Sequence, residues 1–519
     1  MRVLRLFLFC LILLFCQTAL AAKGTLLYVP MDNRPVCLDY TVQSMKAAGW
    51  DVQTPPEEYI ANATAVGNTE ELFNWLEQEA ETSTAIVVSA DAMIYGGLVA
   101  SRTHELPWQV VKERTERLLA LKQNFHGQNV YVFTTIMRSP KASSAPVEPA
   151  YYEKWGPKLF RMGALEDKLE LKQLKRKELK ELADLRNELP AEVTSDMYMR
   201  RRNNIRATEL LLSGVESGDF DYMLIGRDDT ATFSQAHREA RNLDILVREL
   251  PKERIRFFAG ADQLGLLLLS RAVTRLNYEL PLVNVTYAAG EGGNTIPSYE
   301  DDTVAESAKQ HIFAAGAFPA TDRKHVDLVL AVNTPRNGVT LEASNAVNNY
   351  TLTPEVKDFT HKVKRIAEKH PVALADVKYG NGADNALVKQ LFAEGIAYEL
   401  KAYDGWNTAG NSLGYALAQG LLHKLYKEED KNNLLNIRYL DDWAYQANAR
   451  MKVYQETIWP QYWPNSGLKD KQLEGAQEAV SQEIIKTAEP IMGDVVREYH
   501  FSLPWQRMFE VQVSRVELH

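Results

Sequence analysis

Cysteine is scarce in this 519-residue chain, which contains three: Cys10, Cys16 and Cys37. We expect the first two to leave with an N-terminal leader, so one thiol remains. A single cysteine cannot form an internal disulfide, and a four-cysteine zinc site is excluded on the same ground. Stability must therefore come from a large hydrophobic core, which a chain of this length can bury.

Long hydrophobic runs are also missing. The apolar stretch 6–15 is too short to span a bilayer core, which needs roughly 20 residues. Arg2 and Arg5 precede it and Ala19-Leu20-Ala21 follows, a pattern typical of a secretory signal peptide cleaved after Ala21 or Ala22. We expect an exported protein, periplasmic or secreted, without stable membrane insertion after cleavage.

Several catalytic signatures are absent as well. The chain has no Gly-x-Ser-x-Gly elbow and no His-Glu-x-x-His, and its ten histidines lack metal-ligand spacing. Serine hydrolases and zinc peptidases are therefore disfavoured. The formal net charge of −9 argues against a nucleic-acid partner and suits a neutral or cationic small molecule. No cofactor is predicted, although carboxylates could bind a divalent cation.

Short apolar runs rich in β-branched and aromatic residues recur along the chain, each followed by a polar motif and a helix-like stretch. This alternation predicts βα units of the α/β class. We predict a parallel-strand (β/α) barrel-like core with a second, smaller α/β lobe, and two doubly wound lobes are the alternative. The runs are residues 25–29, 51–54, 85–88, 130–134, 222–225, 255–258, 282–285, 326–332, 372–375 and 398–402.

A leucine-rich stretch at 165–189 interrupts this pattern. Its leucines recur at helical spacing among many Lys and Glu residues, which predicts an amphipathic helix. We interpret residues 151–217 as a helical insertion in a βα loop rather than a dimerising coiled coil. The predicted organisation is a signal peptide at 1–22, an α/β core at 23–320 that carries the insertion, and a C-terminal lobe with closing helices at 321–519.

Polar motifs follow two of the first predicted strands, where α/β folds place their sites. Asp32 and Arg34 follow the first strand and could bind a polar substrate, or could form a local turn pair between prolines. Asp91 leaves the third run ahead of Tyr95-Gly96-Gly97, and Arg102 follows. The two glycines would let the backbone approach a ligand closely.

Adjacent carboxylates, Asp228 and Asp229, follow the fifth run and are our candidate catalytic residues. Two neighbouring acids can divide labour, because the charge of one shifts the pKa of the other. Glycosidases use such pairs, and the same oxygens could bind Mg²⁺ or Ca²⁺. The structural alternative is that Asp229 caps the next helix while Asp228 pairs with Arg227.

The most unusual string surrounds Trp406, Asn407 and Asn411 at a predicted strand-to-helix turn. An aromatic ring can stack on a sugar face while amides bind its hydroxyls. A tightly packed turn with Asn407 as the helix cap is the alternative. Asp384, in a Gly- and Asn-rich loop, is a further candidate for substrate binding.

These motifs together resemble an uncharacterised bacterial family of exported proteins, domain of unknown function 4127. The resemblance covers nearly the whole predicted mature chain and implies a single module, but it carries no established activity. The strings that carry it are Asp32-Asn33-Arg34-Pro35, Ser89-x-Asp91 with Tyr95-Gly96-Gly97 and Ser101-Arg102, Asp228-Asp229, and Gly405-Trp406-Asn407-Thr408-Ala409-Gly410-Asn411.

Carboxylates and amides at strand ends, with an aromatic residue nearby, favour a hydrolase of glycosidase type acting on a carbohydrate-like substrate. In that hypothesis Asp228 and Asp229 supply the acid chemistry, and the other candidates bind substrate. Two alternatives remain: an envelope protein that binds a sugar or cell-wall fragment without turnover, and a metal-dependent phosphoesterase.

Overall fold

A computed structural model describes residues 24–516, apart from 125–126 and 144. The predicted signal peptide at 1–22 lies outside the described residues, so export stays a prediction. Among the helices that are described, none combines the length and apolar character needed to cross a bilayer.

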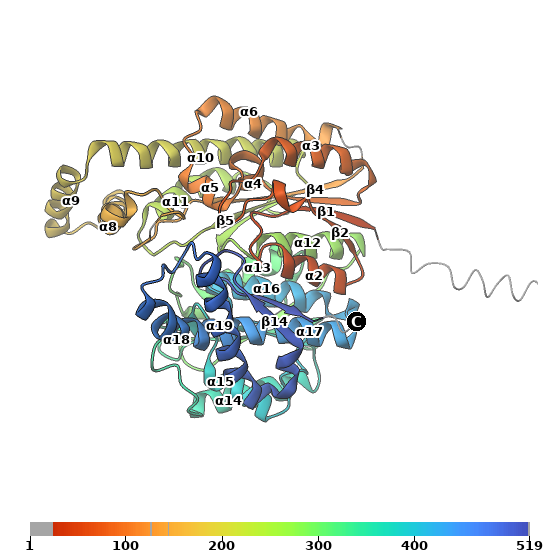
Figure 1. The fold of residues 1–519 in the computed structure, drawn as a ribbon. Helices are drawn as coiled ribbons and strands as arrows, with labels where there is room; N and C mark the ends of the chain where they lie inside the picture. The colour runs from red at the N-terminus through yellow and green to blue at the C-terminus, as the bar shows by residue number, and fades with distance from the viewer. Residues whose placement is uncertain (1–23, 125–126, 144, 517–519) are drawn as a thin grey trace, which may run out of the picture.

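Two parallel sheets organise the fold, one in each half of the molecule (Figure 1). The first has six strands in the order β2-β1-β3-β4-β5-β6, and the second has five in the order β13-β11-β9-β7-β8. Their strands are β1 (Thr25–Val29), β2 (Asp51–Gln53), β3 (Ala85–Ser89), β4 (Asn129–Ile136), β5 (Tyr222–Arg227) and β6 (Ile255–Ala259), then β7 (Leu282–Tyr287), β8 (Phe318–Pro319), β9 (Leu328–Asn333), β11 (Val372–Asp376) and β13 (Ala402–Asp404).

The α/β class is confirmed, but the strands do not close into a barrel. The two sheets stay open, and β2 and β6 form the edges of the first. Each sheet has the same connectivity, in which the first strand lies between the second and the third, as in doubly wound folds. Two doubly wound lobes, the alternative architecture, therefore describe the arrangement.

The strands change sheet between β6 and β7, which is earlier than the predicted domain boundary at 320/321. Helix α12 (Leu264–Leu276) follows β6 and is buried along nearly its whole length. Such a helix belongs between two layers rather than on a surface. It carries the chain from the first sheet to the second.

Strand residues of the first sheet alternate between two hydrophobic layers. Leu26 and Tyr28 of β1 face a cluster that continues through α12 into the second lobe. Leu27 and Val29 face a separate cluster under the outer helices. Because successive side chains of a strand point to opposite faces, both faces are covered and the apolar runs are continuous.

The layer between the sheets is formed by α12, α13 (Val304–Ala314) and α16 (Ala409–Leu422), which pack on one another. Figure 1 shows them in the middle of the molecule. The remaining helices of the first lobe are α2 (Asp39–Ala47), α3 (Thr69–Glu79), α4 (Ala90–Tyr95), α5 (Leu98–Thr103), α6 (Trp108–Leu119), α7 (Leu121–Asn124) and α11 (Gln235–Arg248). Those after β9 are α14 (Pro354–Ala367), α15 (Asn385–Ala393), α17 (Glu428–Arg438), α18 (Arg450–Val453) and α19 (Asp470–Met492).

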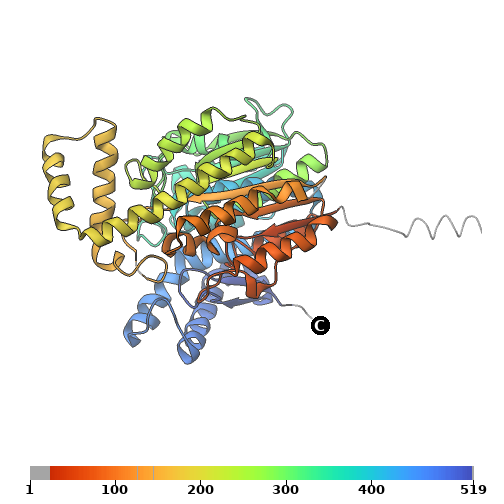
Figure 2. The ribbon, with the colours of Figure 1, turned by 90° about the horizontal axis from the view of Figure 1, so that it is seen from above.

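Three helices fill the stretch between β4 and β5: α8 (Tyr152–Glu170), α9 (Arg176–Glu188) and α10 (Ala191–Ser217). They form an arm that projects from the body in both ribbon views (Figures 1 and 2). Leu165, Leu182 and Met197 belong to a small hydrophobic core of the arm's own. The long helix α10 runs back to the body and packs on α6.

The C-terminal region closes over the second lobe with unusual helical geometry. Helix α17 continues into a π-helical stretch, η5 (Tyr439–Ala449), and α18 continues into a second, η6 (Tyr454–Ile458). Short strands form two further pairs: β10 (Leu341–Glu342) with β12 (Tyr379–Gly380), and β14 (Tyr499–Ser502) with β15 (Gln512–Arg515).

Candidate functional site

The carboxyl ends of the strands lie along one side of the first sheet, which we call the sheet edge. The ends of β1, β3, β5 and β6 bring four acidic residues there: Asp32, Asp91, Asp228 and Asp262. All four are buried. Parallel strands share their direction, so polar residues far apart in sequence meet at this edge, beside the switch point between β1 and β3.

Arg34 links the first of these acids to the last. Its Nε lies 2.9 Å from Asp32 Oδ1, and its Nη2 lies 2.7 Å from Asp262 Oδ1. Burial alone would raise the pKa of Asp262, but the Arg34 guanidinium outweighs burial and lowers it. The predicted pairing of Asp32 with Arg34 is therefore part of a larger ion network. Its third member is Asp262, which follows β6.

Asp91 lies in the first turn of α4, whose N-terminus is capped by Ser89. Its carboxylate accepts hydrogen bonds from the Thr135 N–H and hydroxyl, at 3.0 and 2.8 Å, and from the Thr134 hydroxyl at 3.2 Å. Burial nevertheless raises the pKa of Asp91 to about 7. This carboxyl therefore exchanges its proton near neutral pH.

Asp228 forms an ion pair with Arg102 of α5, at 2.6 Å between Nη2 and Oδ2. Both side chains are almost fully buried, and the Arg102 Nε finds no hydrogen-bond partner among the described residues. The turn between α4 and α5 uses Gly97 at φ +132°, where a Cβ would lie 2.6 Å from the Ala61 Cβ. Gly97 therefore permits the tight turn into α5, the helix that carries Arg102.

Asp229 differs from its neighbour in both backbone and surroundings. Its φ of +24° lies in the left-handed region that non-glycine residues rarely adopt. Its carboxylate lies 3.0 Å from Arg138 Nη1, and its side chain is 24% exposed. Burial, followed by the negative charge of Asp228, raises the pKa of Asp229. The predicted helix-cap role is not seen, because Ser234 caps α11.

Trp406 and Asn411 come from the second lobe and contact Asp262. The Trp406 Nε1–H donates to Asp262 Oδ2 at 3.3 Å, and Asn411 Oδ1 accepts from the Asp262 N–H at 3.2 Å. The Trp406 ring is 2% exposed and packs edge-on against Phe509. It offers no open face for stacking, contrary to the sequence-based expectation. Asn407, at φ +56°, stays partly exposed.

Tyr299, which sequence reasoning missed, is the exposed aromatic residue beside the acid pair. Its carbonyl accepts from the Thr230 N–H at 2.9 Å, directly after Asp229. The side chain is 38% exposed, and its hydroxyl donates to Glu342 at 2.5 Å. No sequence signal marks it, because Tyr299 lies in a loop 70 residues from Asp229.

Two predicted residues serve local structure instead. Asp384 caps α15 and pairs with Lys378 at 2.7 Å, within a second polar group that includes Asp376 and Asn333. Tyr95 stacks on His104, with ring centroids 4.8 Å apart. Among the described contacts, no hydrogen bond or ion pair joins either one to Asp228 or Asp229.

A further buried ion network adjoins Trp406. Arg438 contacts Asp441 at 2.8 Å and Asp442 at 3.1 Å on the π-helical stretch η5. Asp442 accepts from the Gly405 N–H at 2.7 Å, and Asp404 accepts from the Trp406 N–H at 2.9 Å. These carboxylates fix the turn that carries Trp406.

A metal centre has no support in the described part of the chain. No group of three or more His, Cys, Asp or Glu residues has an arrangement that could hold a metal ion there. Arginines engage most of the acids at the sheet edge instead, as the pairs of Asp228 with Arg102 and Asp262 with Arg34 show, and Arg138 pairs with the neighbouring Asp229.

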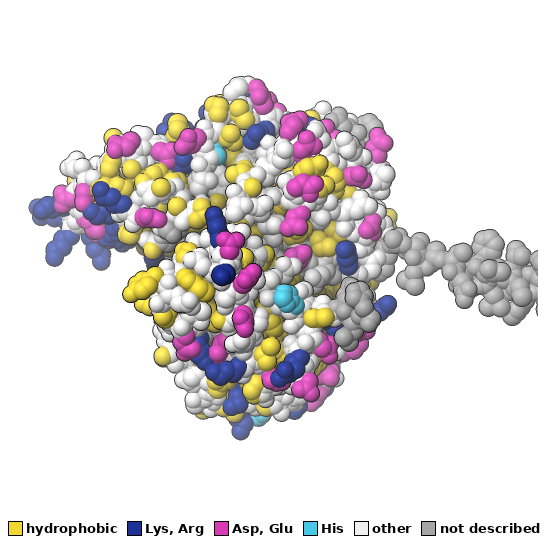
Figure 3. All heavy atoms as spheres, viewed as in Figure 1, with side chains coloured by type: hydrophobic (Ala, Val, Ile, Leu, Met, Phe, Trp, Pro, Cys, Tyr) yellow, Lys and Arg dark blue, Asp and Glu magenta, His cyan; other side chains and the backbone are white. Residues whose placement is uncertain are grey.

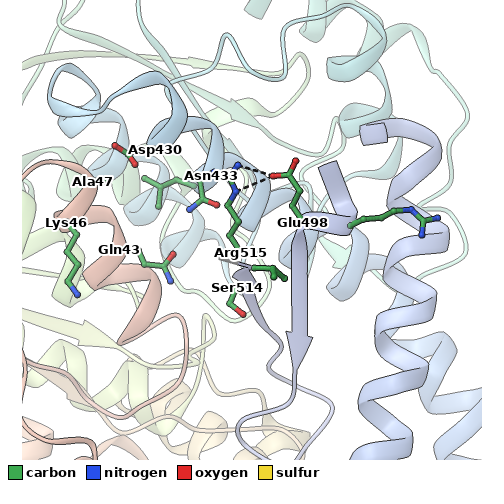
Figure 4. Close-up of a pocket in the computed structure, with 11 residues that line it drawn as sticks. Gln43, Lys46, Ala47, Asp430, Asn433, Glu498, Ser514 and Arg515 are labelled. Atoms are coloured by element: carbon green, nitrogen blue, oxygen red, sulfur yellow. Dashed lines mark hydrogen bonds and ion pairs between the residues drawn. The ribbon is translucent and has the colours of Figure 1, made fainter. Parts of the chain in front are cut away.

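A cavity of about 920 Å³ lies elsewhere, between α2, α17 and β15 (Figure 4). Arg515 on its wall is held by Glu498 at 3.0 Å and by Glu429 at 2.9 Å. None of the predicted site residues lines this cavity; its lining residues are Gln43, Lys46, Ala47, Asp430, Asn433, Leu434, Arg497, Glu498, Ser514, Arg515 and Val516.

A family model described as a protein of unknown function, DUF4127, matches residues 26–514. The chain belongs to this family. The match includes both sheets and every acid described above, so the resemblance inferred from the motifs is confirmed. A search of curated proteins finds no match.

Proposed function

We propose that this member of the family is an exported hydrolase that acts on a carbohydrate-like substrate through Asp228 and Asp229. The observation that carries the proposal is the unequal environment of the two carboxyls. Arg102 pairs with Asp228 at 2.6 Å and Arg138 with Asp229 at 3.0 Å, but burial and the Asp228 charge outweigh Arg138 and raise the pKa of Asp229. A proton donor beside a charged carboxylate is the pair that glycosidic hydrolysis requires.

The backbone of Asp229 supports the same role. A non-glycine residue held at φ +24° costs on the order of 1–3 kcal/mol. Such strain concentrates at sites where a side chain must be aimed, and Asp229 is the more exposed member of the pair. We therefore assign Asp229 as the proton donor and Asp228, held by Arg102, as its partner carboxyl.

Substrate contact falls to partly exposed side chains of the second lobe, of which Tyr299 is held next to Asp229 by the hydrogen bond from the Thr230 N–H to its carbonyl. Tyr299 provides an aromatic face and Asn407 an amide, and both are accessible in part. Asp262 contacts both Arg34 and Trp406, and Arg34 also pairs with Asp32. These buried side chains therefore support the site from within the fold and do not stack on a sugar.

The test is hydrolysis of a panel of chromogenic glycosides by the wild-type protein, Asp228→Asn and Asp229→Asn. A positioned acid contributes roughly 10²- to 10⁴-fold, so each variant should lose at least about 100-fold in rate. Asp244→Asn, which removes a surface carboxylate paired with Arg248 on the same helix, is the matched control. Activity that survives in both variants would refute the assignment.

Binding without turnover is the second candidate, and the buried Arg102 Nε without a partner favours it. An unpaired buried donor is costly, and a ligand oxygen would satisfy it. Ligand retention by the wild-type protein, with no product released and retention lost in Arg102→Lys, would select this function over hydrolysis.

A further inference from the structure

The free end of the arm carries a concentrated positive charge in a protein of net charge −9. We define the tip patch as the five exposed cations at the turn between α8 and α9 and on the first turns of α9: Lys172, Lys175, Arg176, Lys177 and Lys180. Dark blue side chains gather at this end of the molecule in Figure 3.

Three acids near the tip patch pair with other residues, whereas the exposed Asp184, four residues after Lys180 on α9, has no ion-pair partner among the described residues. Glu178 pairs with Lys168 at 2.7 Å, and Glu181 with Arg161 at 2.7 Å. Glu170 pairs with Arg238 and Arg241, which come from the body. In contrast, none of the five tip-patch cations has an ion-pair partner among the described residues. The patch is therefore an uncompensated charge, unlike the alternating pairs of an ordinary solvated helix.

Two leucines are exposed beside these cations. Leu169, at the end of α8, is 42% exposed, and Leu179, on α9, is 53% exposed. The inward leucines of the same helices are buried in the arm's core, as Leu165 and Leu182 show. Leu169 and Leu179 therefore do not complete that core, and they lie where a partner surface would cover them.

We propose that the tip patch docks the protein on an anionic phospholipid membrane surface. Clustered Lys and Arg side chains bind anionic headgroups, and neighbouring leucines can enter the boundary with the acyl chains. The patch lies on an arm that projects from the body (Figures 1 and 2), and all five of its side chains are exposed. A nucleic acid or another linear polyanion is matched better by a groove with stacking aromatics.

The tip patch and the proposed catalytic acids are separate sets of residues. Asp228 and Asp229 lie in the body at the ends of the first sheet's strands, whereas α9 contacts α8 within the arm. The arm is not isolated from the body, because α8 packs on α11 and Glu170 pairs with Arg238 and Arg241 of that helix. However, none of the five tip-patch cations forms an ion pair with Asp228 or Asp229 among the described residues. Membrane docking and the proposed chemistry are therefore separable by mutation.

The experiment is co-sedimentation of the full chain with vesicles of phosphatidylglycerol and phosphatidylcholine in equal parts, compared with phosphatidylcholine alone. The tip variant replaces the patch: Lys172→Gln, Lys175→Gln, Arg176→Gln, Lys177→Gln and Lys180→Gln. The control variant removes five exposed cations of the second lobe: Lys324→Gln, Lys357→Gln, Arg365→Gln, Lys369→Gln and Lys389→Gln. The N-terminal apolar segment is common to all samples, so differences between variants report the patch.

We expect wild-type and control proteins to bind the anionic vesicles and the tip variant to bind at least tenfold more weakly. Binding should fall when salt rises from 0.1 to 1 M, because the Debye length shortens from about 10 to 3 Å. Leu169→Ser with Leu179→Ser should weaken the binding that remains at high salt. Equal binding by tip and control variants, or no preference for anionic lipid, would overturn the proposal. Binding of the patch to polyphosphate or heparin without vesicle binding would also overturn it.

Discussion

At the residue scale, the acids of the sheet edge differ in how their charge is compensated. Asp228 and Asp262 each face a guanidinium at 2.6–2.7 Å, whereas Asp91 receives hydrogen bonds only from threonines. Neutral donors stabilise a carboxylate less than a full positive charge does. For this reason burial prevails at Asp91 and raises its pKa to about 7.

Asp91→Asn should therefore flatten part of the dependence of stability on pH. The pKa of Asp91 in the folded protein, about 7, exceeds the value of about 3.9 for an unfolded chain. The folded state thus holds this proton more tightly, and the resulting stabilisation is full below pH ~4 and lost as pH rises through 7. The loss amounts to at most about 4 kcal/mol. Urea unfolding at pH 5 and at pH 8 measures the free energy of unfolding of the wild-type protein and of Asp91→Asn. An equal change in that free energy between the two pH values in both proteins would contradict a raised pKa of Asp91.

Arg102→Ala should be among the most destabilising substitutions at the site. It leaves the Asp228 charge buried without its partner, which costs about 3–5 kcal/mol. Arg186→Ala is the matched control, because Arg186 also pairs with a carboxylate, that of Glu166, but is 52% exposed. The loss of this exposed arginine should cost ~1 kcal/mol or less. Similar midpoints of chemical denaturation for the two variants would show that the Arg102 pair is not buried in solution.

At the element scale, buried strands were the most predictable features. The run at 25–29 coincides with β1 because a strand covered on both faces is apolar throughout. The last predicted strand, 398–402, was misplaced: the chain turns at Ile396–Glu399, and β13 begins at Ala402. Tyr398 lies in this turn and not in a strand, and its ring packs edge-on against Phe392. A tyrosine can thus pack against its neighbours from a strand or from a turn. Local composition does not distinguish these two uses of tyrosine.

The arm should be able to unfold without the body. Leu182 is 1% exposed in the arm's own small core, and Leu182→Ala should cost about 2–5 kcal/mol of local stability. Hydrogen exchange should then accelerate in α8 and α9, while β3 to β5 stay protected. Leu179→Ala, at a half-exposed position of the same helix, should leave exchange unchanged. Faster exchange throughout the sheets would show instead that the arm and body unfold as one unit.

At the scale of the whole molecule, the contacts between lobes were beyond sequence reasoning. The residues around Trp406 stood out in the sequence, but its partners Asp262 and Phe509 lie about 100 residues or more away along the chain. A polar motif can be recognised in the sequence, but the sequence does not show which residues of the other lobe it will contact. Arg34 and Arg102 stood out in local motifs, but Arg138, which pairs with Asp229, is brought there by the topology of the sheet and carries no local signal.

Buried carboxyls throughout the molecule should set its stability optimum on the acidic side. Burial raises the pKa of Glu300 to about 8, of Asp404 to about 7 and of Asp376 to about 6. Stabilisation from these groups is lost as pH rises through those values. Acids with a lowered pKa, such as Asp262, act in the opposite direction below pH ~4. The Tm should therefore be higher at pH 5 than at pH 8, and a Tm that rises steadily to pH 8 would contradict these pKa shifts.

The raised pKa of Asp229 is the central claim, and pH-difference infrared spectroscopy of the carboxyl stretch tests it without a known substrate. The wild-type spectrum minus that of Asp229→Asn isolates one carboxyl from the other buried acids. We expect the lost band to titrate above the usual range of an aspartate, because burial and the Asp228 charge raise the pKa of Asp229. A lost band that titrates at or below pH 4 would contradict the assignment of Asp229 as the proton donor.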